Sequence, residues 1–429
     1  MQTLLTALAL SATTALAVPS SANDAIEHTI VESMANEIEN NYVYPEKGAS
    51  AAALLRETLS SGRLDSMQGD ELANVIRAGM VEHTKDLHFG VRALPEGWAP
   101  PTTNEEAQTR QEPQAPYGFS RVERLDGNIG YIDLRGFNNA RYIEETVEAS
   151  MRLVQGCDSL IFDLRRNGGG DPHAVALITS YLYDPSEPVH LNSLYYRPAD
   201  ETTEFWTHDQ IDTDLAMPDV PVYILTSSRT FSAAEEFTYN LRNLKRATVV
   251  GETTGGGAHP VDSIILHSDA TDRYYQLVLP IARAISPITK TNWEGTGVEP
   301  HIACDADEAL DQALMDAYAK LDSAGNRSVR FGLAALTARL SPVQLSEASK
   351  LEYAGSYTDR EVKLVDGVLM YRRIGVSDFN PLICVEKDTF VIEGVSDFIM
   401  EFDRNELGSI VAINGIYGQH HTDRSDRDD

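Results

Sequence analysis

The stretch VYILTSSRTFSAAEEF, residues 222–237, predicts a strand, a tight turn and a helix in immediate succession. The strand is the apolar run that ends at Leu225, and Ser232 opens the helix. A serine in this position faces the positive end of the helix dipole, which suits a nucleophile whose transition state gains negative charge. Ser232 and Glu235 also form the Ser-x-x-Glu pattern of a capping box. Taken alone, the stretch favours an ordinary helix start over a catalytic serine.

Strands and helices alternate on both sides of this stretch. Short apolar runs predict strands, and apolar residues at helical spacing predict helices. Strands are expected at 129–134, 160–164 and 247–250, and helices at 143–154, 232–244 and 307–321. Because the alternation extends over roughly 200 residues, it predicts an α/β core, placed at 119–325.

The chain before this core has a different character. Residues 23–94 carry three apolar stripes at helical spacing and predict a small helical bundle. Residues 95–118 contain several prolines among Gln, Glu and Thr, which is typical of a linker.

The chain after the core predicts a separate antiparallel β-domain at 341–420. Asp366-Gly367 and Asn414-Gly415 are dipeptides typical of hairpin turns. Phe398, Met400 and Phe402 alternate at the period of a strand. The acidic segment 421–429 is expected to be a disordered tail.

The N-terminus predicts a signal peptide over residues 1–22. Leu4 to Ala17 is an uncharged apolar run that is too short to span a bilayer. Small residues at the expected spacing place the cleavage near Ala17 or Ala22, which predicts a secreted or periplasmic protein. The leading residues contain no Lys or Arg, so an N-terminal core helix is the alternative reading.

The composition excludes several classes of protein. Of 429 residues, 65 are acidic and 35 are Lys or Arg, which gives a formal net charge of −30. Binding of nucleic acid through its phosphates needs clustered positive charge, so no nucleic acid partner is expected. No apolar stretch beyond the N-terminus is long enough for a stable membrane span. The three cysteines form no Cys-x-x-Cys pair, and we expect neither a metal nor a cofactor.

Three further segments could carry chemistry. DLRRNGGG at 163–170 follows a buried strand, and its glycines would let backbone amides approach an oxyanion or a phosphate, or form an ordinary turn. His88 and His259 are candidate bases, although a single histidine is more often structural. In WEGTGVEP at 293–300, glycines lie close to the carboxylate of Glu294. Taken alone, this segment is typical of a surface loop.

Taken together and in chain order, these segments resemble the tail-specific, or C-terminal processing, serine peptidase family. The branch they resemble holds the tricorn core protease and the interphotoreceptor retinoid-binding protein. The matching pieces also include NYVYP at 41–45, DLH at 86–88 and GETTGGG at 251–257. The resemblance implies that the core is a crotonase-like ββα superhelix. The segment around Leu351 to Tyr357 looks like the lipocalin-like β-domains of some bacterial serine hydrolases.

The resemblance also implies roles for individual residues. Ser232 matches the nucleophile, His88 the base, and Glu294 the carboxylate that completes the arrangement. Gly169 or Gly170, with the amide of Ala233, matches the oxyanion hole.

Two departures from the family pattern matter. Many members use a lysine base, but Gly257 occupies that position here, so His88 must serve and His259 is the reserve base. Many members also carry a PDZ domain, for which the linker at 95–118 is too short.

The sequence therefore predicts a serine-type peptidase that hydrolyses short or unfolded peptides, with its oligomeric state left open. The alternative is a non-catalytic binding protein for apolar ligands on the same fold. Acyl-CoA chemistry on that fold is a third and weaker reading.

Overall fold

The computed structural model describes residues 22–102, 118–268, 272–395, 397–418 and 421–428. The chain divides into two compact units, and each is described by itself. The first comprises Met1–Thr109, Tyr196–Glu201 and His259–Arg283, and the second comprises Arg110–Tyr195, Thr202–Ala258 and Ala284–Asp429. The expected signal peptide and most of the expected linker lie outside the described residues.

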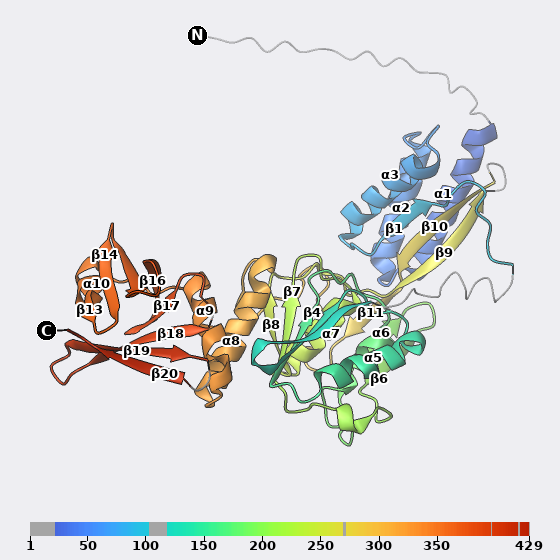
Figure 1. The fold of residues 1–429 in the computed structure, drawn as a ribbon. Coiled ribbons are helices and arrows are strands. Elements are labelled where there is room, and N and C mark those ends of the chain that lie inside the picture. Colours follow the sequence, from blue (N-terminus) through green and yellow to red (C-terminus); the bar gives the residue numbers. More distant parts are fainter. Residues whose placement is uncertain (1–21, 103–117, 269–271, 396, 419–420, 429) are drawn as a thin grey trace, which may run out of the picture. The chain divides into compact units, whose positions relative to one another are not determined.

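The first unit packs three helices against a small antiparallel sheet (Figure 1). The helices are α1 (Ala22–Asn41), α2 (Pro45–Ser60) and α3 (Gly69–Thr84), and the sheet has the order β1 (Gly90–Ala93), β10 (Arg273–Pro280), β9 (Val261–Ser268). Tyr275, Leu277 and Leu279 alternate along β10, are fully buried and pack with the helices. The expected bundle at 23–94 is therefore incomplete by itself. The β9–β10 hairpin lies within the range 119–325 that the sequence assigns to the core, but it packs in the first unit, because a strand pattern does not reveal its packing partner.

The second unit is built around a six-stranded sheet of order β12-β8-β7-β4-β3-β2. Its strands are parallel except β2, which pairs antiparallel with β3. In sequence order they are β2 (Phe119–Leu125), β3 (Ile129–Leu134), β4 (Ser159–Asp163), β7 (Val222–Thr226), β8 (Ala247–Gly251) and β12 (Ile302–Ala303). A further sheet has the order β11 (Ala282–Ile285), β5 (His190–Tyr196), β6 (Glu201–Trp206).

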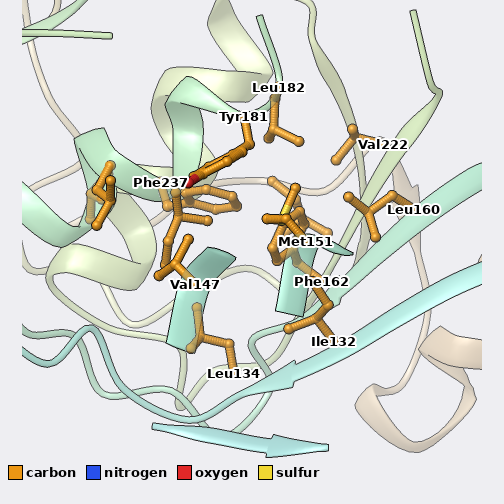
Figure 2. Close-up of a cluster of buried hydrophobic side chains, with 14 of the residues drawn as sticks. Ile132, Leu134, Val147, Met151, Leu160, Phe162, Tyr181, Leu182, Val222 and Phe237 are labelled. Atoms are coloured by element: carbon orange, nitrogen blue, oxygen red, sulfur yellow. The ribbon is translucent and has the colours of Figure 1, made fainter. Parts of the chain in front are cut away.

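Helices cover both faces of the central sheet, because its strands are apolar on both sides. Ile132 and Phe162 on one face pack with α5 (Ala140–Val154), α6 (Pro172–Ser180) and α7 (Ala233–Asn243), and Figure 2 shows this cluster. Tyr131 and Ile161 on the other face pack with α8 (Ala309–Ser323). The predicted α/β core is confirmed.

The C-terminal part of the second unit is an eight-stranded antiparallel meander that runs in order from β13 to β20. An isolated bridge from Tyr357 to Arg427 brings the first strand beside the end of the last, so the sheet nearly closes on itself. Two helices precede it, α9 (Arg330–Leu340) and α10 (Glu347–Tyr353). The strands are β13 (Gly355–Tyr357), β14 (Arg360–Val365), β15 (Val368–Arg373), β16 (Asn380–Glu386), β17 (Thr389–Ile392), β18 (Phe398–Arg404), β19 (Ile410–Tyr417) and β20 (His421–Asp426).

The predicted antiparallel β-domain is confirmed, with two corrections in detail. Asp366 and Gly367 form the expected hairpin turn, both at positive φ. Asn414 and Gly415 do not turn, because both are paired within β19. The expected disordered tail contains β20, which pairs with β19 along its length, so main-chain hydrogen bonding orders a segment that composition alone marks as polar.

Candidate active site

The turn between β7 and α7 holds Ser232 in an unusual backbone conformation. Its φ is +55° and its ψ is −124°, a combination that L residues rarely adopt. Strained backbone of this kind persists where the surrounding structure fixes it, and it clusters at functional sites. Thr230 helps to fix the turn, because its hydroxyl donates to the carbonyl of Leu164 at 2.8 Å and accepts the N–H of Ser227 at 3.0 Å.

The buried carboxylate of Glu235 connects this turn to the glycine-rich loop at 254–257. Its Oε2 accepts the N–H of Ser232 at 2.9 Å and the N–H of Gly257 at 2.8 Å. Its Oε1 accepts the Thr254 hydroxyl at 2.5 Å and the N–H of Gly256 at 2.7 Å. Burial raises the pKa of Glu235 despite these four bonds, which favour the ionised form. Glu235 is thus the common anchor of two segments that lie about twenty residues apart in sequence.

The glycine segment after β4 lies directly against the Ser232 turn. A Cβ built on Gly169 would lie 2.7 Å from the Cβ of Ser232 and 2.9 Å from the amide nitrogen of Ala233. Gly169 has a φ of +109° and Gly170 a φ of +143°, which also favour glycine. The segment is held by buried Asn167, whose Oδ1 accepts the Gly169 N–H at 2.9 Å and whose carbonyl accepts the Phe231 N–H at 3.1 Å.

Two backbone amides remain available to bind an oxyanion. The Gly169 amide is occupied by Asn167. Within the described residues, the N–H groups of Gly170 and Ala233 donate to no acceptor. The geometry therefore favours Gly170 over Gly169 as the partner of Ala233, an alternative that the sequence left open.

Glu294 lies beside the glycine-rich loop. Its Oε2 accepts the N–H of Ala258 at 2.6 Å. The preceding Trp293 is buried and donates its indole N–H to the carbonyl of Gly257 at 2.6 Å. Gly295 donates its N–H to the carbonyl of Gly256 at 2.9 Å. The segment that looked like a surface loop is therefore bonded to the loop that Glu235 anchors.

The two candidate histidines lie together in the first unit, around buried Asp86. His259 Nδ1 lies 2.7 Å from Asp86 Oδ2, and the ring of Tyr44 packs edge-on against His259. His88 donates its backbone N–H to Asp86 Oδ1 at 3.0 Å, whereas its Nδ1 lies 3.9 Å from that oxygen. The Tyr42 hydroxyl donates to Asp86 Oδ2 at 3.1 Å.

Burial and neighbouring charges shift the pKa values of His88 and Asp86. Burial lowers the pKa of His88 to about 4, Asp86 opposes that shift and His259 adds to it. Burial also acts to raise the pKa of Asp86, but the hydrogen bond and charge of His259, with His88, hold that pKa below its usual value. At neutral pH His88 is therefore an uncharged imidazole, which is the form that accepts a proton.

The structure groups the predicted site residues within the two units. Ser232, Gly169, Gly170, Ala233 and Glu294 belong to the second unit, and His88 and His259 belong to the first. Within either unit, the described residues bring no three metal-ligating side chains together.

Sequence reasoning missed the structural roles of three residues. The sequence pattern indicates only a helix cap at Glu235 and gives no role to Asp86 or Asn167. A buried acid or amide within a glycine-rich motif was the available signal, because such a group needs several hydrogen-bond partners.

Part of the chain is similar to known proteins. Residues 128–304 match Peptidase family S41. A carboxyl-terminal-processing protease of Synechocystis sp. is 32% identical over 129 residues, 30% of this chain and 28% of that protein. The chloroplastic carboxyl-terminal-processing peptidase 1 of Arabidopsis thaliana is 24% identical over 215 residues, 49% of this chain and 41% of that protein. The chain thus spans less than half the length of these relatives.

Solved structures with a similar fold include two peptidases. A putative peptidase from Parabacteroides merdae is 21% identical, with a TM-score of 0.49 over 71% of this chain and 99% of that one. The tricorn protease is 14% identical, with a TM-score of 0.43 over 68% of this chain and 36% of that one.

Residues 128–304 are thus similar to Peptidase family S41, which supports the predicted resemblance over this segment. The matched residues include Ser232, the glycine segment at 168–170 and Glu294. In the described part of the chain, no helix combines the length and hydrophobicity needed to cross a bilayer.

Proposed function

We propose that this protein is an exported serine peptidase that hydrolyses peptide bonds in short or unfolded peptides through Ser232. The observation that carries the proposal is the strained Ser232 turn beside the amides of Gly170 and Ala233, which donate to no acceptor in the described part of the chain. Such amides stabilise negative charge on the carbonyl oxygen of a tetrahedral intermediate. The apolar run at 4–17 supports export, with the mature chain beginning after Ala17 or Ala22.

In the proposed mechanism, Ser232 Oγ attacks the scissile carbonyl carbon. His88 takes the hydroxyl proton and gives it to the leaving amine, and water then hydrolyses the acyl-enzyme. The N–H groups of Gly170 and Ala233 hold the oxyanion. Glu294 supports the loop before His259 by accepting the N–H of Ala258. None of these steps draws on a metal or a cofactor.

A second assignment of the base is favoured by one specific observation. His259, unlike His88, makes a 2.7 Å side-chain hydrogen bond to Asp86, the arrangement in which a carboxylate orients a histidine base. If His259 is the base, His259→Ala abolishes turnover and His88→Ala retains it. Inactivation by His88→Ala, with activity retained in His259→Ala, supports the first assignment.

Replacing Ser232 tests the peptidase function. Ser232→Ala should lower kcat on an unfolded peptide by several powers of ten, as loss of a nucleophile does. Ser228→Ala, an exposed serine on the same turn, is the matched control and should keep wild-type turnover. Circular dichroism checks that both variants fold. A folded Ser232→Ala protein with wild-type turnover would exclude the mechanism, and absence of turnover in the folded wild type would favour the non-catalytic alternative.

A further inference from the structure

Helix α7 carries a polar face that begins at the proposed nucleophile. Ser232, Glu236 and Asn240 follow one another at intervals of four residues, so they share one side of the helix. The residues that follow each of them, Ala233, Phe237 and Leu241, are buried in the apolar core. The polar side is buried as well, since Glu236 is 5% exposed and Asn240 is 2% exposed.

Asn192 of β5 meets this face. It is 1% exposed, and it acts on Glu236 closely enough to lower the pKa of that carboxyl group. Among the described residues, Glu236 Oε1 and both amide atoms of Asn192 and of Asn240 have no hydrogen-bond partner of full geometry. Asn192 lies close enough to Glu236 to act as its hydrogen-bond donor. Buried polar atoms in native proteins are nearly always paired, so the remaining amide atoms of Asn192 and Asn240 point to a group that binds there.

Glu236 lies one helical turn after the proposed nucleophile, and its backbone N–H donates to the carbonyl of Ser232 at 2.9 Å. Side chains on a helix lean toward its N-terminus, so Glu236 leans toward the turn that carries Ser232. Asp171, which follows Gly170 and caps α6, is near enough for its charge to act on Glu236. Burial, with a contribution from Asp171, raises the pKa of Glu236 to about 8. Asp171 is the charged group that faces Glu236.

We propose that Glu236, Asn192 and Asn240 form a specificity subsite that receives a lysine or arginine side chain beside the scissile bond. The proposal rests on the peptidase function proposed above. An ammonium or guanidinium group would donate to the amide oxygens, and ionised Glu236 would accept the amide N–H groups and balance the charge. A neutral apolar side chain would supply no partner to the amide atoms of Asn192 and Asn240, which disfavours it.

Two peptides that differ in one side chain test the subsite. One has lysine and the other has norleucine on the acyl side of the scissile bond, and kcat/KM is measured for both between pH 6.5 and 9. Wild type should prefer the lysine peptide, and the ratio should rise with pH as Glu236 ionises. The ratio of the two kcat/KM values removes the pH dependence of the groups that perform the hydrolysis, because these groups act on both peptides alike. Glu236→Gln should lower this ratio by about tenfold or more and flatten its pH dependence.

Two further variants, one in the cluster and one control outside it, help to interpret the ratio of the two kcat/KM values. Asn192→Ala removes the opposite wall of the cluster and should change the ratio in the same direction as Glu236→Gln. Asp316→Asn removes a carboxylate of α8, where Asp316 accepts the Tyr223 hydroxyl, and should leave the ratio unchanged. A ratio near one, a preference for a neutral polar side chain, or a ratio insensitive to Glu236→Gln would overturn the subsite. Cleavage of the norleucine peptide alone would leave the peptidase function standing.

A binding measurement tests the subsite independently of turnover. Millimolar n-butylammonium, a mimic of the lysine side chain, should raise the Tm of wild type saturably at pH 8.5 and should not raise that of Glu236→Gln. Absence of the shift in wild type would overturn the subsite even in an active enzyme. A shift in a protein that cleaves neither peptide would contradict the peptidase function alone.

Discussion

Gly169 lies against Ser232 so closely that the chain has no room for a Cβ at position 169. The added atom would lie 2.7 Å from Ser232 Cβ and 3.0 Å from the carbonyl oxygen of Phe231. Real Cβ atoms essentially never approach other atoms this closely, so the backbone would have to move. The contact fixes the glycine segment directly against the serine turn, beside the amides that we propose to bind the oxyanion.

We predict that Gly169→Ala lowers kcat by at least about tenfold, because displacement of the oxyanion amides weakens transition-state stabilisation. Gly168→Ala is the matched control, since a Cβ at Gly168 would meet nothing within 4 Å. Steady-state kinetics on one peptide compares the two variants. Equal activity in both would show that the close contact has no part in the reaction.

We predict that Glu235→Gln reduces both turnover and stability. A glutamine places an amide N–H₂ against donors, so some of the four groups that Glu235 now accepts lose their partner. The expected loss in unfolding free energy is about 1–3 kcal/mol for each buried group left unpaired. Urea unfolding and kinetics measure the two effects, with exposed Glu299→Gln as the control. A variant as stable and as active as wild type would contradict the anchoring role.

The regular elements of the core followed from residue patterns. The apolar run before Ser232 is strand β7, and the helix expected from 232 is α7. Local periodicity determines these elements, because a buried parallel strand and an amphipathic helix each need a specific spacing of apolar residues.

Long-range partners did not follow from such patterns. The pairing of Val91 with Leu277 in the first unit joins segments far apart in sequence, and no local pattern encodes it. The capping pattern of Glu235 likewise gives no indication that its carboxylate accepts the N–H groups of Gly256 and Gly257. The closeness of His259 to Asp86 also depends on that long-range pairing.

We predict that the burial of His88 makes the unfolding free energy of the protein depend on pH. Its pKa is about 4 in the folded protein, below the ordinary histidine value of 6.5, so the unfolded chain binds more protons between those values. Stability from this group is therefore complete above pH 6.5 and is lost as the pH falls through 4, by about 3 kcal/mol in total. The unfolding free energy of wild type and His88→Gln, measured at pH 7 and pH 4.5, isolates the contribution of His88. An identical pH dependence in the two proteins would contradict the burial of a neutral imidazole.

The base assignment also predicts the pH dependence of turnover. If His88 accepts the proton, kcat/KM should rise with pH through the pKa of His88 in the free enzyme, near 4, and be level above about pH 5. The profile is measured with an uncharged peptide between pH 3.5 and 8. A rising limb well above pH 5 that persists in His88→Ala would contradict His88 as the base, and loss of turnover in His259→Ala would then transfer the role to His259.

Covalent labelling tests the nucleophile most directly. The folded protein is treated with a fluorophosphonate probe, digested, and analysed by mass spectrometry to locate the modified residue. We predict a single modification at Ser232, absent from the Ser232→Ala protein and retained in Ser228→Ala. A label on another residue, or peptide hydrolysis by a protein that takes no label at Ser232, would contradict the central claim.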